Sequence, residues 1–121
     1  MDAYDSQAEL LKALAHPVRL QILDILRDGE QCVCHIEAVL GQRQSYISQH
    51  LMLLRKTGLV ADRKDGLRVY YRVHDSSVYA VLDVARSLIS RQAQKYGRSL
   101  SFALPQSEGC SCPKCSPDGV C

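Results

Sequence analysis

The sequence predicts one mainly helical domain that carries a single small β-hairpin. Apolar residues recur at helical spacing in five segments, which are separated by Gly, Pro and His-Asp breaks. One further stretch alternates apolar and polar residues around Asp65-Gly66, a strong hairpin signal. The length of 121 residues, with 46% hydrophobic and 23% charged residues, fits one globular domain.

Three helices are expected in the first third of the chain. Residues 6–15 place their leucines on one helical stripe. Pro17 suits the first turn of a second helix over residues 18–27, because the N–H that proline lacks would be unpaired there. A third, short helix is expected over residues 32–40, where Gly41 ends it.

The fourth helix has one apolar and one polar face. Ser45 is expected to cap its start, and Gly58 is expected to stop it. Ile47, Leu51 and Leu54 form an i, i+4, i+7 stripe that would face a core. A short helix, a Gly-containing turn and a polar-faced second helix together predict a helix-turn-helix.

A β-hairpin is expected directly after this helix pair. Residues 59–61 and 67–73 are typical of two strands, with Asp65-Gly66 at the turn between them. Three basic residues gather near the tip, which is unusual for a plain surface hairpin. The sequence therefore predicts a winged helix-turn-helix, with the hairpin as the wing.

A last long helix is expected from Asp75-Ser76 to about residue 96. A small domain can hardly bury the apolar stripes of both its first and its last helix. We therefore expect a homodimer that joins through these two helices, as a pseudo-palindromic DNA site would need. Residues 1–98 would form the DNA-binding and dimerisation domain, and residues 99–121, rich in Cys, Pro and Gly, a tail without its own core.

The charge is concentrated on the helix-turn-helix and the wing. The formal net charge is only +2, yet residues 43–72 hold seven basic and two acidic residues. Charge alone would also fit a solvated face, but beside these motifs it indicates binding to the phosphates of double-stranded operator DNA. Glutamine and hydroxyl side chains can read base edges, and basic ones bind phosphates. The candidate DNA contacts are Arg43, Gln44, Ser45, Tyr46, Ser48, Gln49, Lys56, Arg63, Lys64 and Arg68.

The sequence predicts a cytoplasmic protein without a membrane partner. No apolar run is long enough to span a bilayer and no basic leader follows Met1.

The six cysteines point to metal or redox chemistry, because cysteines in the cytoplasm more often bind metals or react than form structural disulfides. Cys32 and Cys34 precede the helix-turn-helix, and the others form a C-x-C-x2-C-x5-C pattern in the tail. The candidate ligands are Cys32, Cys34, Cys110, Cys112, Cys115 and Cys121.

The spacing of Cys32 and Cys34 limits how they can share an ion. On a regular helix, the side chains of residues i and i+2 point about 200° apart. Cys32 and Cys34 can therefore reach one ion only if the helix starts or distorts between them. The tail cysteines could complete this site from either protomer or hold a separate ion. The tail could also be disordered, with reactive thiols that scavenge metal or form disulfides. As(III) and Sb(III) favour three thiolates, Cd(II) and Pb(II) accept three or four, and Zn(II) prefers four. His16 and His50 are expected to be capping or packing groups rather than ligands.

Four segments in order closely resemble the ArsR/SmtB family of metal-sensing repressors, over about residues 8–75. They are LKALAHPVRLQIL, CVC, QSYISQHLMLLRKTGLV and DRKDGLRVYYRV. The resemblance implies a homodimeric winged-helix protein that leaves its operator when a metal or metalloid binds, and Cys32 and Cys34 match the family's Cys-Val-Cys. Glu37 stands where the arsenic-sensing branch has a third cysteine, and the last helix lacks the His residues of the family's other metal site.

These observations predict a repressor that As(III) or Sb(III) releases from DNA. One alternative is the same repressor with Cd(II), Pb(II) or Zn(II) as inducer, and another is a thiol redox or persulfide sensor. A thiol-rich metal buffer with incidental basic charge is a third. An enzyme is not expected, because the sequence has neither a phosphate-binding loop nor a paired acid and base.

Overall fold

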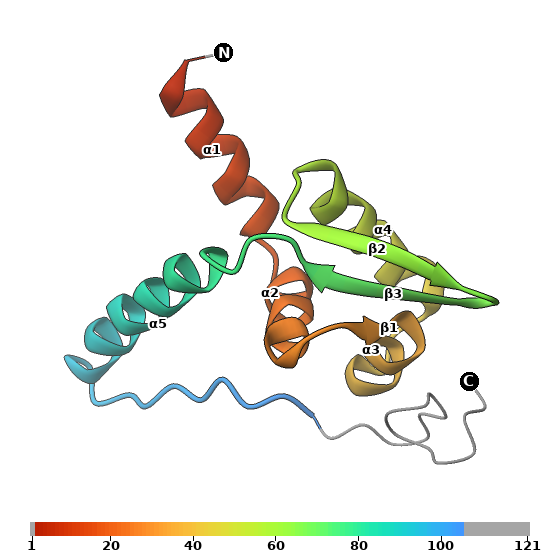
Figure 1. The fold of residues 1–121 in the computed structure, drawn as a ribbon. Helices are drawn as coiled ribbons and strands as arrows, with labels where there is room; N and C mark the ends of the chain where they lie inside the picture. Colours follow the sequence, from red (N-terminus) through yellow and green to blue (C-terminus); the bar gives the residue numbers. More distant parts are fainter. Residues whose placement is uncertain (1, 106–121) are drawn as a thin grey trace.

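The computed structural model describes residues 2–105 as a group of helices around a small antiparallel sheet (Figure 1). In chain order the elements are α1 (Ala3–Leu14), α2 (Pro17–Ile25), the 3-10 helix η1 (Leu26–Asp28), β1 (Gln31–Cys32), α3 (Val33–Leu40), α4 (Gln44–Lys56), β2 (Val60–Asp65), β3 (Arg68–Val73) and α5 (Val78–Gln94). The predicted fold class, mainly helical with a β-hairpin wing, is confirmed.

Local side-chain caps set the starts of the first two helices. α1 begins at Ala3, earlier than predicted, because the Asp2 carboxylate accepts a hydrogen bond from the Asp5 backbone N–H at 2.8 Å. α2 begins at Pro17 as expected, and the ring of His16 caps it: its Nδ1 accepts from the Val18 N–H at 3.1 Å. The prediction that His16 is a capping group is thus confirmed.

Two further predicted helix starts, those of α4 and α5, are also wrong. α4 begins one residue before Ser45, with Arg43 in the extended conformation that precedes a helix, so Ser45 lies in the first turn and does not cap it. α5 begins at Val78 rather than at Asp75. The Asp75 carboxylate accepts a hydrogen bond from the Ser77 N–H at 3.0 Å, which forms a turn ahead of the helix.

The sheet contains three strands, one more than predicted. β2 and β3 form the expected hairpin, with Gly66 at the turn in a left-handed conformation. The unpredicted strand β1 pairs antiparallel with β3, so that Cys32 lies opposite Tyr70, and the strand order is β1-β3-β2. This pairing joins the start of the cysteine pair directly to the wing.

The core lies between α2, α3, α4 and the sheet. Its largest fully buried side chains are Ile22, Leu23, Ile36, Ile47, Leu51 and Leu54. α5 is held to α2 by the Tyr79 hydroxyl, which donates to the Leu23 carbonyl at 2.6 Å, and by the Arg86–Asp24 ion pair. Beyond α5 the chain runs back along the molecule, where Leu104 packs against the core (Figure 1).

Candidate DNA-binding and thiol site

Helix α4 carries the polar face predicted to read DNA. Ile47, Leu51 and Leu54 are fully buried, and this anchoring turns the opposite side of the helix outward. Gln44, Ser45 and Gln49 are exposed on that side, together with a half-buried Ser48. Lys56 lies exposed in the last turn, and Arg43 lies exposed just before the helix.

Tyr46 and His50 belong to the core side of α4. Tyr46 is half-buried and its ring packs edge-on against that of His50, with 4.7 Å between ring centroids. His50 is buried beside His16 at 4.3 Å, and its Nδ1 has no hydrogen-bond partner among residues 2–105. Burial, with smaller effects of His16 and Arg19, lowers the pKa of His50. The prediction that His50 is a packing group is confirmed, whereas the placement of Tyr46 does not favour a base contact.

The basic residues of the wing differ in what they contact. The strand register sets Lys64 opposite Val69 and Arg68 opposite Asp65, both near the tip. Within the described part of the chain, neither Lys64 nor Arg68 forms an ion pair. Arg63 instead pairs with Glu30, and the hydrogen bonds that the guanidinium donates to the Glu30 carboxylate raise the pKa of Arg63. No local pattern predicts this pairing, since the two residues are 33 positions apart.

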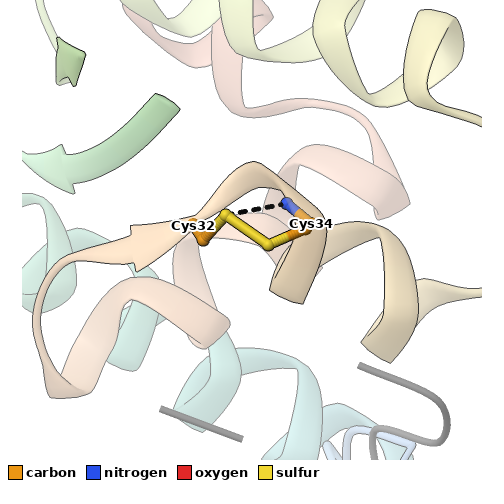
Figure 2. Close-up of a disulfide and its surroundings, with 2 residues drawn as sticks. All are labelled: Cys32 and Cys34. Atoms are coloured by element: carbon orange, nitrogen blue, oxygen red, sulfur yellow. Dashed lines mark hydrogen bonds between the residues drawn. A yellow bond between two sulfur atoms is a disulfide. The ribbon is translucent and has the colours of Figure 1, made fainter. Parts of the chain in front are cut away.

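The cysteine pair lies where a strand becomes a helix (Figure 2). Cys32 is the extended residue that precedes α3, and its Sγ accepts a hydrogen bond from the Cys34 N–H at 3.3 Å. The helix therefore begins between the two cysteines, which lets their side chains meet. In this structure they form a disulfide, with 5.2 Å between the two Cα atoms. Cys32 is buried and Cys34 half-buried.

The cysteines open into a cavity that is also lined by residues predicted to contact DNA. Its volume is about 340 Å³. Cys32 at the end of β1 lines it, α3 contributes Cys34 and Glu37, and α4 contributes Gln44 and Ser48. The wing contributes Leu67, Arg68, Val69 and Tyr71. An ion or small molecule bound to the sulfur atoms would therefore lie next to side chains of both the recognition helix and the wing.

Glu37 also lines this cavity. In the sequence it stands out only because it occupies the position where the arsenic-sensing branch has a third cysteine. Its Oε1 is buried and has no hydrogen-bond partner among the described residues, and burial raises the pKa of the carboxyl group. The i, i+3 spacing to Cys34 places both side chains on one side of α3, which was readable from the sequence.

No complete metal site is present in residues 2–105: no three His, Cys, Asp or Glu side chains there are grouped to hold an ion. The four predicted tail ligands, Cys110, Cys112, Cys115 and Cys121, lie outside the described residues. Of the candidate ligands, the structure brings together Cys32 and Cys34 alone. A search of the same residues for a helix long and apolar enough to cross a membrane finds none.

The fold, the outward polar face of α4 and the basic wing define a DNA-binding winged helix-turn-helix protein. Comparison with known protein families identifies the family to which this protein belongs. Residues 16–62 match the family described as "Bacterial regulatory protein, arsR family". The chain belongs to this ArsR family, and it is a transcriptional regulator rather than an enzyme.

Relatives from distant organisms cover much of the chain. An uncharacterised HTH-type transcriptional regulator of Methanocaldococcus jannaschii is 38% identical over 89 residues, which are 73% of this chain and 100% of the relative. The arsenical resistance operon repressor of Escherichia coli K12 is 48% identical over 66 residues, 54% of this chain and 56% of the repressor. The ArsR/SmtB resemblance of the sequence is thus confirmed at the level of the family.

Solved structures agree with the fold. The crystal structure of Rv0081 from Mycobacterium tuberculosis superposes with a TM-score of 0.73 at 32% identity, and covers 81% of this chain and 99% of that one. A homodimeric winged helix-turn-helix domain from Mycobacterium bovis gives a TM-score of 0.64 at 36% identity, over 71% and 80% of the two chains. A metal buffer with incidental basic charge does not fit a member of this regulator family.

Neutralising the wing lysine is expected to weaken DNA binding without changing its specificity. Lys64 is exposed near the wing tip and is not held by a carboxylate of the described chain. For Lys64→Gln we expect the slope of log affinity against log salt to become shallower by about 0.9, the effect of losing one phosphate contact. Fluorescence anisotropy on promoter DNA and on an unrelated duplex measures both slopes. Lys95→Gln, at the end of α5, is the control; equal slopes for the two variants would contradict the assignment of Lys64.

Proposed function

We propose that this regulator is a cytoplasmic, homodimeric repressor that leaves its operator when As(III) or Sb(III) binds the thiolates of Cys32 and Cys34. One observation carries the proposal: the cysteine pair shares its cavity with Gln44, Ser48 and Arg68. A ligand on the sulfur atoms would change the surface that reads DNA. The similarity to a repressor named for arsenical resistance supports this inducer class.

Binding of As(III) requires Cys32 and Cys34 in their reduced form. Two electrons and two protons convert the disulfide to two thiols, and each thiol that replaces a hydroxide of arsenous acid releases one water. A third ligand is still needed for the three-thiolate geometry that As(III) favours. We propose that a tail cysteine, among Cys110, Cys112, Cys115 and Cys121, supplies it from the same or the partner protomer. If a second tail cysteine also binds, the site has four thiolates and would suit Cd(II), Pb(II) or Zn(II).

A thiol redox or persulfide switch is the second candidate function. The observation that favours it is the Cys32–Cys34 disulfide itself. In this reading the oxidised and reduced proteins differ in operator affinity, and no metalloid is needed.

Arsenite is expected to release the fully reduced protein from its promoter DNA. A hundredfold fall in affinity corresponds to a coupling free energy of about 2.7 kcal/mol, and DNA would weaken arsenite binding by the same factor. Fluorescence anisotropy measures the release, with a phosphine as reductant because dithiol reductants chelate arsenite. Cys32→Ser and Cys34→Ser should each abolish the response, while serine at all four tail positions tests the third ligand.

Each outcome separates the candidates. Release by arsenite under reduction that depends on Cys32 supports the metalloid repressor. DNA that stays bound in arsenite but dissociates with Cd(II), Pb(II) or Zn(II) moves the inducer to that ion. Release by a mild oxidant alone, reversed by the phosphine, identifies the redox switch and overturns the arsenite proposal.

A further inference from the structure

Arg63 is the only one of the three predicted wing cations that the described chain holds in an ion pair. Its Nε lies 3.3 and 3.1 Å from the two carboxylate oxygens of Glu30, and its Nη2 lies 2.7 Å from Oε1. This is a two-nitrogen, two-oxygen contact, the arrangement in which a guanidinium binds a carboxylate or a phosphate best. Asp65 approaches the remaining nitrogen at 3.7 Å.

The sheet fixes the direction in which Arg63 points. Arg63 on β2, Tyr70 on β3 and Cys32 on β1 lie opposite one another in the register, so the three positions form one row across the sheet. The guanidinium lies over the Tyr70 ring, 4.7 Å from its centroid. Arg63 thus reaches across the central strand toward Glu30, which stands two residues before Cys32.

We propose that Glu30 is an internal competitor of operator phosphate for Arg63. A phosphate offers the guanidinium the same pair of oxygens that the Glu30 carboxylate occupies, and one guanidinium edge cannot serve both. The pair is open to solvent, with Arg63 48% and Glu30 28% exposed, so DNA can reach it. Exposed ion pairs are also weak, and a phosphate can therefore displace the carboxylate.

The competition sets operator affinity below what the wing charges alone would give. While Glu30 holds Arg63, the wing presents Lys64 and Arg68 to DNA, and docking Arg63 first requires breaking its pair. The inference depends only on DNA binding by this chain and not on the identity of any inducer.

Glu30→Gln tests the proposal, because it removes the competing charge and keeps the size of the side chain. We expect affinity for promoter DNA at low salt to rise about two- to fivefold, the range typical of an exposed ion pair. The slope of log affinity against log salt should steepen by up to about 0.9. Glu9→Gln is the matched control, since it removes an equal charge that pairs with Lys12 on α1, away from the sheet.

The double variant separates competition from simple charge repulsion. If Glu30 acts through Arg63, then Glu30→Gln produces no gain when it is introduced into Arg63→Gln. A gain that persists in the double variant, or one that Glu9→Gln reproduces, overturns the proposal. Because these measurements use no arsenite, a failure of the arsenite titration would leave their result unaffected, and the reverse also holds. Thermal unfolding of each variant confirms that it is folded.

Discussion

If the chain forms the proposed homodimer, a glutamate in place of Leu88 is expected to turn it into monomers and to lower operator affinity at least a hundredfold. Leu88 is 49% exposed on α5, and Val81 and Val84 lie on the same side of this helix with 40% and 67% exposure. The side chain of Leu11 on α1 is also exposed. Both helices lie on the side of the molecule away from the wing tip (Figure 1).

The physical reason is the cost of burying a charge without a partner. If this apolar surface forms the dimer interface, a carboxylate at position 88 must lose its water inside an apolar contact. A monomer then reaches one half of a two-fold operator, which removes the phosphate and base contacts of the second half.

Sedimentation and anisotropy at the same protomer concentration measure the two effects. Gln94→Glu is the matched control, because it adds the same charge to α5 but its side chain points about 120° away from that of Leu88 around the helix. We expect it to leave both mass and affinity near those of the parent protein. A Leu88→Glu variant that sediments as a dimer would place the interface elsewhere.

The helices were predictable because their signals are local. The stripe of Ile47, Leu51 and Leu54 predicts the buried face of α4, and all three side chains are fully buried. Pro17 marked the first turn of α2, and Gly66 marked the hairpin. Such signals act within a few residues, where backbone conformation and helical spacing decide the outcome.

The errors arose where distant segments decide the structure. Strand β1 has two residues, too few to show an alternating pattern, and it exists because β3 offers an edge to pair with. The error at Ser45 differs because it is local: the backbone turns into α4 at Arg43, ahead of the side chain that was expected to cap the helix. For a pair such as Arg63 and Glu30, 33 residues apart, the sequence holds no local signal.

The site was predictable in part for the same reason. A helix that starts between Cys32 and Cys34 was one of two ways in which both could reach one ion, and α3 starts there. The shared cavity with Gln44 and Arg68 depends on how α3, α4 and the wing pack, which spacing along the chain does not contain.

Truncation of Leu51 is expected to remove a large part of the stability of the domain. Leu51 is fully buried at the centre of α4, and a buried Leu→Ala change costs about 2–5 kcal/mol in lost burial and residual cavity. Domains of this size unfold with only about 5–15 kcal/mol. The free energy of unfolding in urea, at one fixed protomer concentration, should therefore fall steeply, with an unchanged dependence on denaturant.

Met52, the residue after Leu51, provides the control for this prediction. Met52 is 47% exposed on the same helix, so Met52→Ala should change the unfolding free energy by no more than about 0.5 kcal/mol. Because Ile47, Leu51 and Leu54 orient the polar face of α4, Leu51→Ala should also weaken operator binding under conditions in which the protein is still folded. Equal stabilities for the two variants would mean that α4 does not depend on this buried stripe for its position.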